Sequence, residues 1–369
     1  MSDRNLTFAQ SINEAISQAM EMDKNVICYG LGVDDPKGVF GTTLGLQKRF
    51  GNKRVFDMPT SENAMTGIAI GASLNGIRPV MTHQRLDFFL LAMDQLVNNA
   101  AKWHYMFGGK SHVPITIRLI LGRGWGQGPT HSQSLQSWFA HVPGLKVVMP
   151  TTTADAKGLL LSSIFDDNPV VFLEHRWLHN LEGDVPEGDY RVPIGKAQVL
   201  REGSDVTIVS MSYMTIEALH AIEFLNSHQR SNSPSLLVGE GWGEGVAEGC
   251  EIIDLRTIKP LDWETVFTSV RKTGRLIVLD TGNDFCSVGS EIIARVSSEC
   301  FESLKCAPKI LSLPDLPSPT SPALSKNYYK GTKDIVEAVA DMMNFTVDLS
   351  PLTFQLPHDV PGDWFKGPF

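Results

Sequence analysis

A single carboxylate, Glu62, lies where a predicted strand ends and a predicted helix begins. The strand is expected at 55–59 (VFDMP), and Thr60 and Ser61 lead into the helix. A carboxylate in the first turn of a helix interacts favourably with the helix dipole, by a few tenths to about 1 kcal/mol. That structural role competes with a chemical one, in which Glu62 works as an acid or a base.

A histidine in a loop is the second candidate. His131 lies in a stretch rich in Gly and Pro, 124–144 (GWGQGPTHSQSLQSWFAHVPG), after a strand expected at 115–121. Loops at the carboxyl ends of parallel strands are where the sites of α/β proteins form. A lone loop histidine is still more often solvated or structural, and His141 is better explained as part of the turn that follows it.

The third candidate is the stretch 161–172 (LSSIFDDNPVVF). Asp166 and Asn168 could end a helix and form a turn before Pro169. They could equally offer oxygen ligands to a hard monovalent cation. The residues alone leave both readings open.

The elements that must position these residues alternate between strand and helix. Short apolar runs predict buried parallel strands at 26–30, 55–59, 78–83, 115–121, 147–150 and 169–175. The pattern restarts with strands expected at 205–211, 250–256, 275–281 and 309–313. We therefore predict an α/β protein of two domains, each a mainly parallel sheet flanked by helices, at 1–190 and 205–345.

The connecting segments differ in composition from the domains. Residues 191–204 are expected to be a linker, because Gly, Pro and charged residues dominate there. Residues 227–249 are dense in Gly, Ser and Glu, and we interpret them as a surface insertion because they lack a phosphate-loop motif. The Pro-rich tail, 346–369, is expected to dock in extended form.

Composition excludes several classes of function. The net charge of −9 argues against nucleic acid as a partner, because phosphate binding needs a basic face. No apolar run approaches the roughly 20 residues that span a bilayer, and the N-terminus lacks a signal-peptide core. The five cysteines are scattered without a C-x-x-C pair, which fits a reducing cytoplasm better than a disulfide framework or structural zinc.

Taken together, these stretches resemble a known family. The chain is similar, over about residues 5–343, to the β-subunit of the thiamine-dependent first component of 2-oxo acid dehydrogenase complexes, which act on pyruvate, branched-chain 2-oxo acids or acetoin. The resemblance rests on RVFDMPTSENAMTGIAIGASLNGIRPV, DQLVNNAAKWHYMFGGK, THSQSLQSWFAHVPGLKVVMPTTTADAKGLL, DNPVVFLEH and CEIIDLRTIKPLDWETV, in order and spacing. It implies a transketolase-like pyrimidine-binding domain followed by a transketolase C-terminal-like domain.

The resemblance also implies roles for individual residues. Glu62 would hydrogen-bond the aminopyrimidine ring of thiamine diphosphate and help activate it. Phe88 would stack on that ring, although a core phenylalanine is the alternative. His131 would assist acyl transfer to a lipoyl group. A potassium site found in part of the family maps, mostly through backbone oxygens, to Ile115, Thr116, Ser163, Ile164, Asp166 and Asn168.

One half of the site is missing from this chain. The family's α-subunit carries a Gly-Asp-Gly motif and an Asn pair that hold Mg²⁺ and the diphosphate, whereas Asn98-Asn99 here has no such motif upstream. The resemblance therefore implies an enzyme that is active only with an α-subunit, in a heterotetramer with a second β-subunit, and that works with a lipoyl acyltransferase.

Some positions depart from the family pattern. Leu31-Gly32 replaces an acidic pair, Thr130 replaces a commoner Gln, and residues 81–85 (MTHQR) replace a segment that contains Glu. His83 and Arg85 thus bring polar and basic groups close to the cofactor. These departures leave open a substrate other than pyruvate and an acceptor other than lipoamide. A carboligase or synthase of the same architecture and a non-catalytic assembly subunit are the alternative functions.

Overall fold

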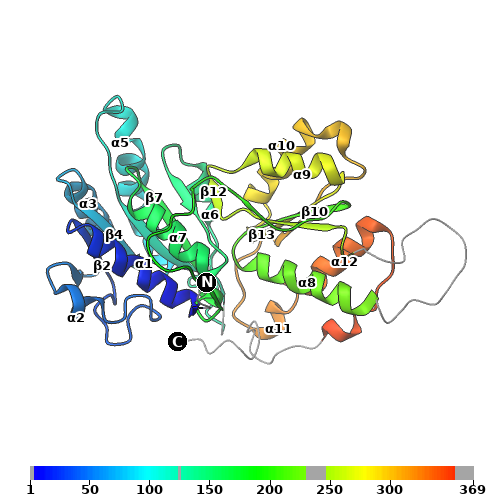
Figure 1. Ribbon diagram of the computed structural model, residues 1–369, viewed down its shortest axis with the longest axis horizontal. Coiled ribbons are helices and arrows are strands. Elements are labelled where there is room, and N and C mark those ends of the chain that lie inside the picture. The colour runs from blue at the N-terminus through cyan, green and yellow to red at the C-terminus, as the bar shows by residue number, and fades with distance from the viewer. Residues whose placement is uncertain (1–3, 124–125, 230–246, 354–369) are drawn as a thin grey trace, which may run out of the picture. The chain divides into compact units, whose positions relative to one another are not determined.

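Two compact units make up the chain in this computed structural model (Figure 1), which describes residues 4–123, 126–229 and 247–353. The first unit runs up to Lys196 and includes Thr257–Pro260. The second holds Ala197–Arg256 and the residues from Leu261 onward. Each unit has its own sheet with helices on it, so the predicted two-domain α/β fold is confirmed.

The sheet of the first unit has its strands in the order β12-β6-β7-β5-β4-β2-β3. Every neighbouring pair is parallel except β12 and β6. Most of its residues are buried and apolar, as expected for a parallel sheet covered on both faces. The strands are β2 (Val26–Gly30), β3 (Val55–Asp57), β4 (Arg78–His83), β5 (Thr116–Leu121), β6 (Lys146–Val148), β7 (Val170–His175) and β12 (Thr257–Lys259).

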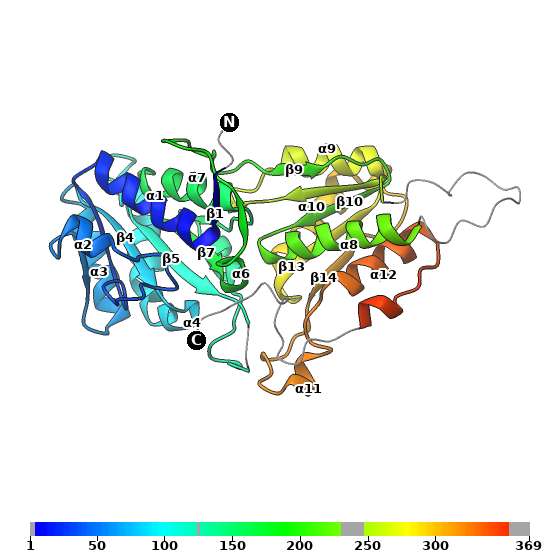
Figure 2. The same ribbon diagram turned by 60° about the horizontal axis from the view of Figure 1, so that its bottom comes forward.

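Helices cover both faces of this sheet. α1 (Phe8–Met22) and α7 (Thr153–Ile164) lie side by side on one face, and Figure 2 shows α3 (Glu62–Ser73) and α4 (Leu86–Phe89) on the other. Thr7 begins α1 in a capping box with Gln10. Shorter elements complete the unit: β1 (Asn5–Thr7), which pairs antiparallel with β8 (Glu182–Asp184), α2 (Leu46–Phe50), α6 (Gln136–His141) and the 3₁₀ turn η3 (Arg176–Leu178).

The helical run after α4 changes its hydrogen-bonding pattern along its length. The apolar residues between 89 and 107 recur with the spacing expected of a single amphipathic helix. The structure instead has a 3₁₀ turn, η1 (Leu90–Ala92), a π-helical segment, η2 (Gln95–Ala100), and then α5 (Ala101–Met106). A π-helical insertion shifts the register of the side chains and is common near functional sites.

The second unit is built on a five-stranded sheet in the order β14-β13-β10-β11-β9. Figure 1 shows α8 (Tyr213–Gln229) and α12 (Thr332–Met343) on one face, and α9 (Trp263–Thr273) and α10 (Val288–Glu299) on the other. The strands are β9 (Gln198–Arg201), β10 (Val206–Ser210), β11 (Cys250–Asp254), β13 (Leu276–Asn283) and β14 (Lys309–Leu313), and the remaining short elements are η4 (Phe301–Ser303), α11 (Pro322–Ser325) and η5 (Ser350–Thr353).

Two connecting segments need comment. β9 lies inside the stretch 191–204 that was expected to be a linker, and it pairs antiparallel with β11 at the edge of the second sheet. The described start of the tail packs against the core under α8 and α12 through Phe345, Val347, Leu349 and Leu352. Most of the expected insertion, 230–246, and the rest of the tail, 354–369, lie outside the described residues.

Candidate functional site

A pocket of about 290 Å³ lies at the carboxyl ends of three adjacent parallel strands, β2, β3 and β4. The end of an open parallel sheet is where ligands bind in α/β proteins. The volume lies just below the roughly 300–1,000 Å³ of small-molecule sites, so its size suits a single ring and not a large cofactor. Its lining residues are Leu31, Thr60, Glu62, His83, Gln84 and Phe88.

Glu62 is the first residue of α3, and its side chain is only 6% exposed. Ser61 precedes it without capping the helix through its side chain. Within the described ranges, no group hydrogen-bonds the Glu62 carboxyl group. Because Glu62 lines the pocket, its carboxyl group is free to bond a ligand that enters there.

His83 ends β4 and is 1% exposed. Its ring meets Phe89 edge-on, with the centroids 5.0 Å apart, and neither ring nitrogen has a hydrogen-bond partner among the described residues. Burial lowers the pKa of His83 to about 4, so the ring is neutral at neutral pH. Each buried polar group without a partner typically costs about 1–3 kcal/mol, so the two unpartnered nitrogens of His83 lower the stability of the fold.

The loop after β5 is attached to the start of α4 by three contacts. Gln127 accepts a hydrogen bond from Arg85, Gln133 donates to Asp87 at 2.7 Å, and His131 meets the ring of Phe88. His131 also has its Nδ1 2.9 Å from the hydroxyl oxygen of Thr130. The loop thus holds His131 against a residue that lines the pocket. Phe88 is 38% exposed, whereas its neighbour Phe89 is the one buried in the core.

Two buried arginines lie beneath this loop. Arg85 and Arg176 both donate to the side-chain oxygen of Gln127, the latter at 2.5 Å. Burial, and then the neighbouring Arg85 guanidinium, lowers the pKa of Arg176 to about 9. Burial also lowers the pKa of Arg85. Because both guanidinium groups are buried, their positive charge has little contact with water, and an anion nearby would stabilise it.

A buried ion pair braces the sheet next to the pocket. Arg118 on β5 donates to both carboxylate oxygens of Glu174 on β7, at 2.6 and 2.9 Å, and to Thr82 on β4 at 3.1 Å. His179 lies 3.2 Å from the same carboxylate. Burial alone would raise the pKa of Glu174, but Arg118 and His179 hold it below its ordinary value. The bidentate geometry therefore keeps β4, β5 and β7 in fixed register.

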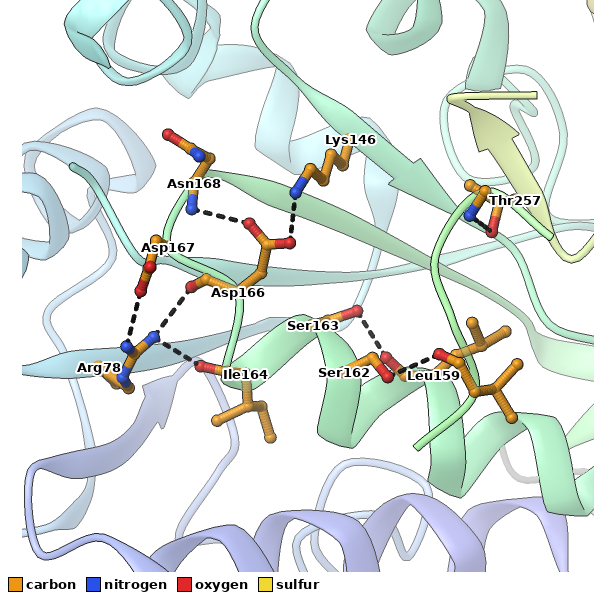
Figure 3. Close-up of polar contacts among 12 residues, drawn as sticks. Arg78, Lys146, Leu159, Ser162, Ser163, Ile164, Asp166, Asp167, Asn168 and Thr257 are labelled. Carbon is orange, nitrogen blue, oxygen red and sulfur yellow. Dashed lines mark hydrogen bonds and ion pairs between the residues drawn. The ribbon is translucent and has the colours of Figure 1, made fainter. Parts of the chain in front are cut away.

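Four of the six residues expected at a potassium site are labelled in Figure 3 around the end of α7: Ser163, Ile164, Asp166 and Asn168. Arg78 donates to the backbone oxygens of Ile164 and Asp166 at 3.3 and 2.9 Å, and to the Asp167 carboxylate at 2.9 Å. Lys146 forms an ion pair with the Asp166 carboxylate.

The other members of this group are also engaged. Asn168 donates its backbone N–H to Asp166 at 2.8 Å. Ser163 donates its hydroxyl to Leu159 at 2.7 Å, and the Ile115 carbonyl accepts from Val170 at 3.0 Å. Thr116 begins β5. The Arg78 guanidinium thus already bonds the backbone oxygens of Ile164 and Asp166. The potassium assignment stays a prediction.

The buried ion pair has a signal in the sequence that the predictions above do not include. Arg118 and Glu174 are single charges inside apolar strand runs, which indicates a buried partner for each. Leu31, Thr60 and Gln84 carry no such signal, because only the packing of three strand ends brings them to one pocket. Among the described residues, no group of three or more His, Cys, Asp or Glu side chains could hold a metal ion. No described helix is long and apolar enough to cross a membrane.

Comparison with known proteins gives matches over both units. Residues 4–180 match the transketolase pyrimidine-binding domain, and residues 244–335 match the transketolase C-terminal domain. A solved structure described as "Split gene transketolase, inactive beta4 tetramer" superposes with a TM-score of 0.69, covering 93% of this chain and 99% of that one. At 20% sequence identity, this likeness concerns the fold alone.

Curated relatives match most of the chain at higher identity. The "Acetoin:2,6-dichlorophenolindophenol oxidoreductase subunit beta" of Cupriavidus necator is 41% identical over 350 residues, which cover 92% of this chain and 98% of the relative. The "Pyruvate dehydrogenase E1 component subunit beta" of Rickettsia felis is 39% identical over 342 residues, which cover 93% and 99%. The Bacillus subtilis acetoin protein is 38% identical over 352 residues, with 92% and 98% covered.

Proposed function

Because this chain belongs to the family of β-subunits of thiamine-diphosphate-dependent 2-oxo acid dehydrogenases, we propose that it supplies the pyrimidine half of a shared active site. The observation that carries the proposal is the pocket at the ends of β2, β3 and β4. There, the largely buried Glu62, whose carboxyl group has no hydrogen-bond partner among the described residues, lies in one small cavity with an aromatic ring. An amino-substituted heteroaromatic ring fits that combination of groups.

Three residues of this chain would have separate roles in the reaction. Glu62 would share a proton with a ring nitrogen of the aminopyrimidine, and Phe88 would stack on the ring face. When bound, thiamine diphosphate supplies the electron sink that decarboxylation of a 2-oxo acid requires. His131, held by Thr130 and Phe88, would assist transfer of the acyl group to a lipoyl domain.

The diphosphate end of the cofactor requires a second polypeptide. Among the described residues, the pocket lining contains no Lys or Arg, and its one charged member, Glu62, would repel a diphosphate. We propose that an α-subunit with a Gly-Asp-Gly motif and an Asn pair holds the diphosphate and Mg²⁺. Two α-subunits and two β-subunits would then close a symmetric assembly with equivalent sites.

Three finer assignments belong to the same proposal. Potassium would take backbone oxygens around the end of α7, where it would compete with the Arg78 guanidinium for those of Ile164 and Asp166. A comparison of melting temperatures in KCl and NaCl tests this assignment.

A lipoyl acyltransferase is the proposed acyl acceptor. A cytoplasmic location stays a prediction from the cysteine pattern.

Experiment can decide between this function and three alternatives. A carboligase of the same architecture would pass the activated fragment to an aldehyde instead of a lipoyl group. The names of two relatives point to acetoin as their substrate, so acetoin is the second candidate for this chain. A non-catalytic role is less well supported, because Glu62 and Phe88 share one pocket and His131 contacts Phe88.

The deciding assay uses this chain co-expressed with its α-partner. A panel of 2-oxo acids and acetoin is offered with 2,6-dichlorophenolindophenol as the electron acceptor, and dye reduction is followed together with CO₂ release. Dye reduction dependent on a 2-oxo acid, with matching CO₂, supports the dehydrogenase function. Reduction with acetoin and no CO₂ favours the acetoin alternative. New carbon–carbon products from an added aldehyde, without dye reduction, would indicate a carboligase.

A further inference from the structure

His83 is the feature of the pocket that the proposed function does not yet use. It is buried at the end of β4, held edge-on by Phe89, and lines the same pocket as Glu62 and Phe88. Within the described ranges, both of its ring nitrogens lack a hydrogen-bond partner. A phenylalanine would fill this aromatic position without burying two polar atoms.

The chemistry of the neutral ring limits what it can bind. A neutral imidazole offers one N–H donor and one nitrogen acceptor, and which nitrogen carries the proton depends on its partner. Glu62, when ionised, only accepts, and Phe88 contributes a ring face. The pocket therefore matches a flat ligand that carries both N–H donors and ring-nitrogen acceptors. An amino-substituted heteroaromatic ring has both kinds of group, whereas a 2-oxo acid anion has no N–H donor.

We propose that His83 makes a second polar contact with the aminopyrimidine ring of the cofactor. Its imidazole would hydrogen-bond one polar group of the ring, and Glu62 would hydrogen-bond another. The inference rests on the proposed function and deepens it. His83 thereby determines how tightly and in which orientation this chain holds the ring. Its hydrogen bond forms before any 2-oxo acid enters the site.

The test begins with binding and uses the complex of this chain with its α-partner. Thiamine diphosphate and Mg²⁺ are titrated by calorimetry without a 2-oxo acid. His83→Phe keeps the aromatic packing and removes both nitrogens, so we expect affinity for the cofactor to fall on the order of tenfold or more. His83→Gln, which restores a donor and an acceptor, should recover part of the loss. His220→Gln changes an exposed histidine on α8 and should bind like the wild type.

A second measurement follows the wild-type complex itself. Histidine labelled with ¹³C at Cε1 is observed by NMR, and the His83 signal is identified by its loss in whichever of His83→Gln and His83→Phe assembles with the α-partner. We expect this signal to shift on adding thiamine diphosphate with Mg²⁺ and to change little when a 2-oxo acid follows.

The outcomes separate this inference from the proposed function. If the wild-type complex binds the cofactor while His83→Phe binds equally well, or while the His83 signal stays still, the inference is wrong and the proposed function stands. A signal that moves only with the 2-oxo acid would assign His83 to the substrate and also overturn it. Failure of the wild-type complex to bind the cofactor would contradict both the inference about His83 and the proposed function.

Discussion

The ring of Phe88 meets the ring of His131 edge-on, with the centroids 5.3 Å apart and the ring planes at 89°. Phe88 follows β4 and lines the pocket, whereas His131 belongs to the loop after β5. The contact therefore joins the residue proposed to stack on the cofactor to the residue proposed to serve acyl transfer. Two steps of one reaction would then share one edge of the pocket.

Replacing Glu62 by Gln should abolish cofactor activation while the fold is kept. The amide cannot share a proton with the pyrimidine, and loss of such a group typically costs on the order of 100- to 10,000-fold in rate. Exchange of the thiazolium C2 proton of the bound cofactor, followed by NMR, measures this step. Glu264→Gln, in the first turn of α9, is the matched control and should leave exchange unchanged. Wild-type exchange in Glu62→Gln would reduce Glu62 to a helix-dipole residue.

Replacing His131 by Ala should impair acyl transfer more than decarboxylation. The decarboxylation half-reaction is assayed with an artificial electron acceptor, and acylation of a lipoyl domain is assayed separately. Thr130→Val removes the hydroxyl next to Nδ1 and should give a smaller loss in the same direction. His141→Ala, at the exposed end of α6, serves as the control. Equal losses in both half-reactions of His131→Ala would place His131 at an earlier step.

The ion pair between Arg118 and Glu174 should dominate the polar contribution to stability of the first unit. Glu174→Gln keeps the shape but leaves the Arg118 charge buried without a counter-ion, which typically costs about 3–5 kcal/mol. Asp189→Asn makes the same chemical change in the exposed pair with Arg191 and should cost less than about 1 kcal/mol. Urea unfolding measures both. Similar losses in the two variants would contradict the assignment.

The depressed pKa of His83 predicts a pH dependence of stability. Between the ordinary value of 6.5 and the folded value of about 4, the unfolded chain binds the extra proton, so the free energy of unfolding falls as the pH falls through this window. His83→Phe should therefore lose less stability than the wild type between pH 7 and pH 5, by on the order of 1–2 kcal/mol. The buried histidines His175 and His179 titrate in both proteins and cancel in the difference. Parallel stability curves would show that His83 is not buried as described.

The sequence predicts the strands better than it predicts the contacts. The apolar runs at 26–30 and 78–83 became β2 and β4 with the expected bounds, because buried parallel strands need continuous apolar residues. β9 and β12 were missed, since each is short and depends on a partner far along the chain. The π-helical segment η2 leaves no mark on the spacing of apolar residues that would distinguish it from an α-helix.

The candidate site divides in the same way. Glu62 and Phe88 could be proposed from their motifs, and the structure brings both to one pocket. The missing hydrogen-bond partners of His83 could not be foreseen, because they depend on what surrounds the ring in three dimensions. The contacts of Gln127 with Arg85 and Arg176 likewise join the segments after β4, β5 and β7, which no local pattern relates.

The central claim is that this chain holds half of a thiamine diphosphate site. Calorimetric titration of the cofactor, with and without Mg²⁺, into the isolated chain and into its complex with the α-partner tests that claim most directly, with light scattering to report the mass of each species. We predict tight, Mg²⁺-dependent binding only to the complex, whose mass should correspond to two copies of each subunit. Tight, Mg²⁺-dependent binding to the isolated chain would contradict the half-site.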